Sequence, residues 1–354
     1  MELPHHEAQP LNPDQSLEPA TPAQAWDWTP TAQAQLHAVS VLCLQGPDSL
    51  RFLHGQSSQA LLGSSPGQLL STCCITPTAR MRALAEVLVD AAGAWLMIHS
   101  GDGDAVRTAL DRVLFPADEL RLGPLQRAWL IQPLPLPADP PDHWRPLEGG
   151  QGFWLGNQLL LLTETEPAAG DASELQDLEP AARALLSLPR LDPQGRERLR
   201  LQWGEPAWPG EINDDTNPFE LGLAPRVSLN KGCYVGQETL ARLATYDGVR
   251  QQLRRWICVS DQDGEAQALA LLTPGARLVS ALGERAGAIT SVLRLDGFTW
   301  IGLALVRRSA LDQEMLVAAT ENPAAPPAEA SEPPLVLRIS RPERFCDPPV
   351  GAGG

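Results

Sequence analysis

The chain of 354 residues contains no apolar stretch of membrane-spanning length, and it lacks the basic start and apolar run of a secretory signal. Basic residues are also in short supply, since 27 Lys and Arg stand against 43 Asp and Glu, giving a formal net charge of −16. An acidic surface repels phosphate backbones, so we expect no broad nucleic-acid interface. These absences predict a cytoplasmic protein with neither a membrane nor a nucleic acid as direct partner.

Cysteine is scarce and is not arranged for metal binding. The sequence has no C-x-x-C pair and no His at ligand spacing, so we expect no zinc or iron–sulfur site made by this chain alone. The scarcity favours a reducing compartment without a disulfide framework. The six cysteines are Cys43, Cys73, Cys74, Cys233, Cys258 and Cys346.

The hydrophobic share of 43% is enough for a sizeable core and for two or three domains. Pro-rich and polar stretches mark the divisions between them. We predict a disordered arm at 1–32, an N-terminal region at 33–248 with an extended connector at 133–146, a C-terminal region at 249–342 with a mobile insertion at 321–334, and a flexible tail at 343–354.

The N-terminal region has the residue pattern of an α+β fold. An apolar helical face at 104–114 and a second one beginning near Asp48 alternate with strand-like runs, in the order of the split-βαβ (ferredoxin-like) motif. A further strand is expected at 153–163 and a further helix at 175–188. The predicted strands of the motif are Val39–Leu44, Leu84–Val89, Trp95–His99 and Ala128–Gln132.

Beyond residue 249 the pattern changes to short strands separated by turns, which is typical of a small antiparallel β-barrel. The predicted barrel strands are Leu253–Val259, Ala276–Ser280, Gly287–Leu293, Trp300–Val306 and Leu335–Ile339.

The most informative stretch is Asn230–Glu238, which combines a cysteine, a cation, two glycines, an amide and a carboxylate. Apolar residues at helical spacing follow it, so Gly236 and Gln237 mark a loop that runs into a helix. The helix start and Lys231 would favour the thiolate of Cys233. The alternative is that Cys233 is a small buried hydrophobe and the glycines only form turns.

The string Lys231-Gly-Cys-Tyr-x-Gly-Gln-Glu238 resembles the signature of the YgfZ-type folate-binding proteins, which are relatives of the glycine-cleavage T-protein, an aminomethyltransferase. The resemblance extends over roughly residues 33–342 and implies three modules around a central hole. It also implies a catalytic or redox role for Cys233 and Lys231, and folate contacts from the rest of the motif. Those expected contacts are Gly232, Tyr234, Gly236, Gln237 and Glu238.

An acidic loop at 203–220 is the second candidate for the folate site. A carboxylate can accept the donor edge of a pterin in bidentate fashion, an indole can stack on the ring, and a folate tail requires a cation. The stretch that begins at Glu211 resembles the T-protein segment whose first glutamate holds the pterin, so Glu211 is the expected pterin ligand. An acidic loop that is simply solvated is the alternative. The other candidates are Glu220, Trp203, Trp208, Arg226 and Arg242.

One departure from the T-protein pattern concerns catalysis. T-proteins carry a catalytic Asp in the first domain, whereas the corresponding stretch here, Thr76–Ala83, has no carboxylate and has Ala79 at the glycine position. A general base must lie within hydrogen-bond reach of its proton, so aminomethyl transfer by that mechanism is not expected.

Two functions therefore stand side by side. The first is a tetrahydrofolate-binding accessory factor for the assembly or repair of iron–sulfur proteins, with such proteins as clients and an indirect effect on tRNA modification, as the resemblance implies. The second is a folate-dependent one-carbon transferase or demethylase of the aminomethyltransferase type. A scaffold with a degenerate pocket is a third possibility, in which no folate binds.

Overall fold

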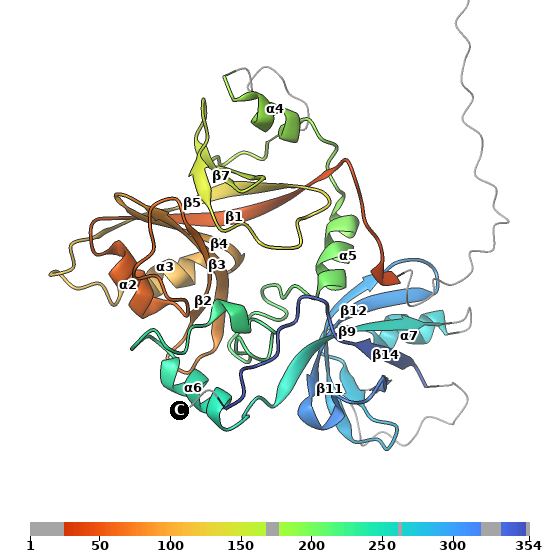
Figure 1. Cartoon of the computed structure of the whole chain (residues 1–354). Helices are drawn as coiled ribbons and strands as arrows, with labels where there is room; N and C mark the ends of the chain where they lie inside the picture. Colours follow the sequence, from red (N-terminus) through yellow and green to blue (C-terminus); the bar gives the residue numbers. More distant parts are fainter. Residues whose placement is uncertain (1–24, 168–176, 261–263, 320–333, 352–354) are drawn as a thin grey trace, which may run out of the picture.

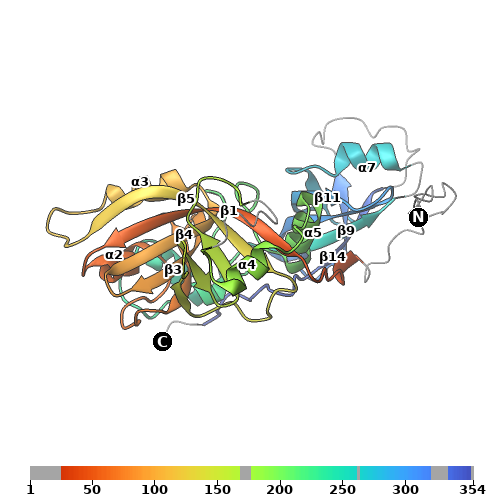
Figure 2. The ribbon, with the colours of Figure 1, turned by 90° about the horizontal axis from the view of Figure 1, so that it is seen from above.

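The computed structural model describes residues 25–167, 177–260, 264–319 and 334–351. It consists of an eight-stranded antiparallel sheet and a closed six-stranded barrel. Figures 1 and 2 show helix α5 (Pro193–Trp203) between these two parts. The predicted α+β class and the C-terminal barrel are confirmed. The first two modules, however, share one continuous sheet.

The sheet has the strand order β2-β3-β4-β1-β5-β8-β7-β6. Its central strands, with helices α2 (Ser49–Gln56) and α3 (Gly103–Asp111), form the predicted split-βαβ motif. The additional strand β2 extends this motif by one strand. The strands are β1 (Ala34–Gln45), β2 (Leu69–Ile75), β3 (Met81–Asp90), β4 (Gly93–Gly101), β5 (Arg121–Pro133), β6 (Trp144–Pro146), β7 (Gly152–Leu155) and β8 (Gln158–Leu161).

The sheet curls until its two edges meet. Trp144 N donates to Gly67 O at 2.8 Å, and Leu69 N donates to Asp142 O at 2.8 Å. Helices α2 and α3 pack on the outer face, whereas the inner face carries Leu88, Met97 and aromatic residues of β6 and β7. Because side chains alternate along a strand, each strand contributes to both of these layers.

Two elements of the N-terminal region differ from the prediction. The strand expected at 153–163 is a hairpin of β7 and β8, because Gly156 with a φ of 59° allows a tight turn. Helix α4 (Pro180–Leu186) begins five residues later than predicted, at a proline that fits the first turn of a helix. The first two residues of the helix predicted at 175–188 lie outside the described residues.

The barrel has the order β10-β11-β12-β9-β14-β13 and surrounds a core that includes the fully buried Trp256. Its sixth strand, β13, was not predicted. The strands are β9 (Gln251–Val259), β10 (Arg277–Val279), β11 (Arg285–Arg294), β12 (Thr299–Arg307), β13 (Met315–Ala319) and β14 (Val336–Ser340). Helix α7 (Glu265–Leu271) packs on it through Ala268. The predicted insertion at 321–334 lies almost entirely outside the described residues.

The predicted arm and tail differ from expectation where they are described. Trp26 is buried and lies under the guanidinium of Arg255 at 4.8 Å, so the packed structure begins before residue 33. Phe345 is buried in the core between the two parts, and Cys346 N donates to Gly222 O at 3.1 Å. The segment at 343–351 is therefore a packed strap over the N-terminal region, held by apolar burial and backbone hydrogen bonds.

Among the described residues no helix is long and apolar enough to cross a membrane.

Candidate functional site

Lys231 anchors the motif loop to the end of helix α2. Its Nζ donates to the carbonyl oxygens of His54, Ser57 (2.7 Å) and Gln59 (2.8 Å), and it lies 4.4 Å from the centre of the Tyr234 ring. His54 Nε2 in turn donates to Lys231 O at 2.8 Å. These contacts satisfy carbonyls that a helix end would otherwise leave unpaired.

The ammonium of Lys231 is thus directed at backbone carbonyls, and the expectation that it activates Cys233 is not supported by its contacts. Burial lowers the pKa of Lys231 to about 7, while the carbonyls and the Tyr234 ring favour its charged form. Lys231 is the only lysine in a chain whose other 26 basic residues, of 27 Lys and Arg, are arginines. A compact ammonium can serve three converging carbonyls, a geometry that a planar guanidinium does not match.

We therefore expect Lys231→Arg to destabilise the protein although it keeps the charge, and Lys231→Met to do the same. The expected loss is about 2 kcal/mol for either variant, because buried carbonyls lose their donors. Urea unfolding of each variant checks this, with the exposed Arg242→Lys as the matched control. If the Lys231→Arg protein is as stable as the wild type, the hydrogen bonds of Lys231 to the carbonyls of His54, Ser57 and Gln59 do not stabilise the fold.

Cys233 is exposed at the surface, whereas its neighbour Tyr234 is buried in the core. Gly232 precedes it with a φ of 88° and open space around it, so the backbone conformation requires glycine there. Burial raises the pKa of Cys73 and Cys74 to about 12 and that of Cys258 to about 11. Cys233 is therefore the most accessible thiol among the six cysteines.

The remaining motif residues form the start of helix α6 (Gln237–Thr245), as predicted. Gly236 begins it with a φ of 80° and lies so close to Thr76 O that a Cβ would clash at 2.8 Å. Glu238 and Arg242 form an ion pair with each other on the solvent-exposed face. Glu238 and Arg242 are thus not directed at a buried site, and a surface pair of this kind contributes little stability.

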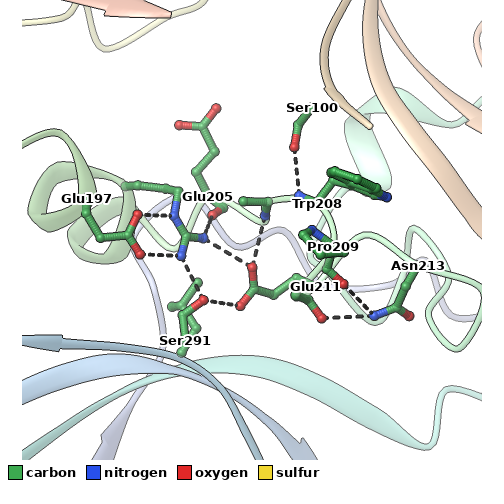
Figure 3. Close-up of polar contacts among 12 residues, drawn as sticks. Ser100, Glu197, Glu205, Trp208, Pro209, Glu211, Asn213 and Ser291 are labelled. Atoms are coloured by element: carbon green, nitrogen blue, oxygen red, sulfur yellow. Dashed lines mark hydrogen bonds and ion pairs between the residues drawn. The ribbon is translucent and has the colours of Figure 1, made fainter. Parts of the chain in front are cut away.

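Glu211, the expected pterin ligand, is part of a buried hydrogen-bonded cluster. Its Oε2 accepts from Arg200 (3.1 Å) and Ala207 N (3.0 Å), and its Oε1 accepts from Ser291 Oγ (2.6 Å). Its side chain is fully buried, and Figure 3 shows its carboxylate beside the barrel residue Ser291. Three donors already bind this fully buried carboxylate, which favours a structural role for Glu211, and direct pterin binding by Glu211 stays a prediction.

The other residues of the acidic loop also have structural partners. Glu220 Oε2 accepts from Asn217 N, while Asn217 Oδ1 accepts from Glu220 N, a reciprocal arrangement like a helix capping box. Burial raises the pKa of Glu220. Trp203 is stacked under Arg344 at 4.5 Å. Trp208 is about half exposed (52%), and its backbone N donates to Ser100 Oγ on β4.

A charged cluster on the inner face of the sheet was missed by the sequence analysis, apart from Arg226. Glu86 on β3 lies 3.0 Å from Arg226 NH1 and 3.5 Å from His99 Nε2 on β4. Burial opposes ionisation of Glu86, but Arg226, His99 and Ser71 outweigh it and lower its pKa to about 2. The cluster is therefore a buried, ionised site between the sheet and the short helix η1 (Ala224–Arg226).

Two further groups interact electrostatically with members of this cluster. Burial lowers the pKa of His37 on β1 to about 4, helped by Arg196 and His99 and opposed by Glu205. The charge of Glu205 also acts on Arg226. Among the described residues, buried Tyr234 Oη has no hydrogen-bond partner, and buried His99 Nε2 has only its contact with Glu86 at 3.5 Å. Buried polar atoms are rarely left unpaired, so each of these two atoms is a point where a ligand or water could bind.

The sequence did contain a signal for the cluster. Glu86 interrupts the apolar run of β3, and His99 follows Leu96, Met97 and Ile98 on β4. A charged residue in a strand that is otherwise apolar on both faces requires a buried partner.

A cavity of about 450 Å³ lies beside β4 and the start of α3, lined by His99, Ser40, Gly101, Asp104 and Arg127 among others. None of the residues predicted to bind folate lines it. The described residues contain no group of three or more side chains suited to a metal ion.

Comparisons with known proteins identify the fold to which this chain is similar. No protein-family model matches the chain. A chloroplastic protein of Arabidopsis thaliana named as an inferred transferase is 27% identical over 239 residues, which cover 59% of this chain. The chain spans about half (52%) of the length of that relative. The crystal structure of the glycine cleavage system aminomethyltransferase T from Bartonella henselae superposes with a TM-score of 0.65, covering 90% of this chain and 88% of its own at 15% identity. The chain thus has the T-protein fold.

Proposed function

We propose that the protein is a cytoplasmic tetrahydrofolate-binding accessory factor for the assembly or repair of iron–sulfur proteins. Its clients would be such proteins, and an effect on tRNA modification would be indirect. The T-protein fold and the YgfZ-type motif support this proposal. The observation that carries it is the exposure of Cys233 on a loop that Lys231 fixes to α2, because a fixed, accessible thiol can contact a client.

The residues on the inner face fit a folate. A pterin offers two neighbouring N–H donors and an acceptor oxygen, which require a carboxylate and a donor in a site shielded from water. On this face Glu86 supplies a carboxylate, and Arg226 and His99, at 3.0 and 3.5 Å from it, supply donors. When bound, the folate would supply one-carbon or reducing chemistry, while the chain's own residues bind and orient it.

The second candidate is a folate-dependent one-carbon transferase, which the Arabidopsis relative favours by its name. The turn between β2 and β3 argues against a transferase. In this turn Ala79 has a φ of 60° and Thr76 N donates to Arg80 O. This turn contains no carboxylate that could act as a base. Formation of methylene-tetrahydrofolate from tetrahydrofolate and a one-carbon donor would favour the transferase.

We expect Cys233→Ala to fold normally and to bind tetrahydrofolate like the wild type, because the thiol is exposed and fills no core space. The same variant should fail to restore iron–sulfur enzyme activity in cells that lack the protein. The measurement is enzyme activity in the complemented cells, with Cys346→Ala as the matched control. Full restoration by Cys233→Ala would remove the cysteine from the mechanism.

A further inference from the structure

The outer surface of three neighbouring barrel strands, β10, β13 and β14, carries a continuous apolar stripe. Side chains alternate along a strand, so the neighbours of the residues in the barrel core point outward. The core residues of these strands include Leu278, Leu316 and Leu337. Among their outward neighbours, Val279 pairs with Val317 and Val317 pairs with Val336, while Met315 lies two positions before Val317 on the same side. These four residues are called the outer stripe. Met315 is 58% exposed and Val336 is 41% exposed.

Two arginines flank the outer stripe. Arg338 pairs with Met315, and Arg277 lies two positions before Val279 on the same side of β10. Neither arginine has an ion-pair partner among the described residues, and the buried Nε of Arg277 has no hydrogen-bond partner there. No outward position of the three strands holds a carboxylate. An exposed apolar surface beside unpaired cations fits an acidic segment that has apolar anchors.

The first 24 residues of the chain have this composition. They contain no Lys or Arg, but they contain four carboxylates and three leucines. These residues are Glu2, Glu7, Asp14, Glu18, Leu3, Leu11 and Leu17. The segment at 320–333, which joins β13 to β14, is also acidic, but it has no leucine, valine, isoleucine, methionine or aromatic residue. Apolar anchors therefore favour residues 1–24 as the occupant of the outer stripe.

The first described residues lie close to the outer stripe. Ala25 and Trp26 are buried beside β9, where Trp26 lies under Arg255 at 4.8 Å (Figure 2). Strand β9 is hydrogen-bonded to β14, with Ile257 opposite Arg338. Adjacent strands are about 4.8 Å apart, so the three strands of the stripe lie within roughly 15 Å of β9. An extended segment of 24 residues can span roughly 80 Å, which is more than enough to cross them.

We propose that the outer stripe is the docking surface for the chain's own residues 1–24. The leucines of this segment pack on the apolar side chains of the stripe, and its carboxylates pair with Arg277 and Arg338. A weak contact is sufficient, because a tethered segment has an effective concentration on the order of millimolar. Docking shields an apolar surface through which two barrels would otherwise associate. The proposal does not depend on folate binding.

The experiment is photo-crosslinking of the full chain with p-benzoylphenylalanine in place of Met315. After irradiation and digestion at acidic residues, mass spectrometry should find the β13 peptide joined to peptides from residues 1–24. Val336 is the second position for the photo-reactive residue, and melting temperatures confirm that both proteins fold. The matched control places the residue at Phe115, which is 70% exposed on the loop after α3 and should give no adduct with residues 1–24.

The charge pairing has its own test in the same protein. Arg338→Glu should lower the yield of the adduct with residues 1–24 by roughly fivefold, because an attraction between exposed groups becomes a repulsion. Arg338→Lys should keep the yield, and added salt should lower it through screening. An unchanged yield in Arg338→Glu would overturn the pairing. An adduct with 320–333, a covalent dimer, or no adduct from either position would overturn the docking of residues 1–24. The first of these results would assign the stripe to the β13–β14 connection, and the second to another copy of the chain.

Discussion

Replacing Glu211 by alanine should lower the free energy of unfolding by about 3–5 kcal/mol, the range for removing one partner of a buried ion pair. Glu211 is fully buried, and the guanidinium of Arg200 beside it would remain charged. The N–H donors of Arg200 are all engaged, with Glu197, Glu205 O, Glu211 and Ser291. The loss would therefore leave one donor of a buried cation without an acceptor.

Urea unfolding without folate measures this effect, with Asp214→Ala as the control because Asp214 lies exposed three residues away. The control should change stability by less than about 0.5 kcal/mol. A Glu211→Ala protein with unchanged stability and weakened folate binding would restore Glu211 as the pterin ligand and contradict the structural role.

The second large expected effect is on the pH dependence of the protein's stability. Glu86→Gln should lower stability at pH 7 by about 3 kcal/mol, because a pKa held at about 2 instead of 4.5 corresponds to that much differential stabilisation of the ionised form. The pKa is depressed in the folded state, so this stabilisation is complete above pH 4.5. It is lost as the pH falls from about 4.5 to 2, because over this range Glu86 takes up a proton in the unfolded chain but remains ionised in the folded protein.

The measurement is the midpoint of urea unfolding between pH 2 and pH 7 for both proteins. The curves of wild type and Glu86→Gln should differ at pH 7 and converge near pH 2. Glu238→Gln is the control, because the side chain of Glu238 is 80% exposed and its pair with Arg242 is screened by solvent. Parallel curves for wild type and Glu86→Gln would show that Glu86 does not carry the acid dependence.

Local patterns were sufficient to predict most of the fold. Alternating apolar residues identified the strands that became β1, β3 and β4, and Gly236 marked the start of α6 because a positive φ there requires glycine. Strand β13 was missed because Met315–Ala319 is short and is largely apolar without clear alternation. The hairpin at Gly156 was read as one strand, since a tight turn interrupts the apolar run by only two residues.

The site was harder to predict because its contacts are long-range. Ser291 reaches Glu211 across 80 positions, and Lys231 reaches the carbonyls of α2 across more than 170. A motif shows which residue types lie together in the chain, but it does not show what occupies their polar atoms. Glu211 and Lys231 therefore matched a functional pattern, although their hydrogen-bonding capacity is used by the fold.

The curled sheet also limits how the molecule can open. Strand β5 is hydrogen-bonded to β1 on one side and to β8 on the other, so the two α+β modules share a single hydrogen-bonded shell. The barrel is joined to this shell by non-covalent seams, of which the bond between Ser291 and Glu211 is one and the burial of Phe345 is another. Separation of the barrel from this shell would therefore require the loss of both contacts.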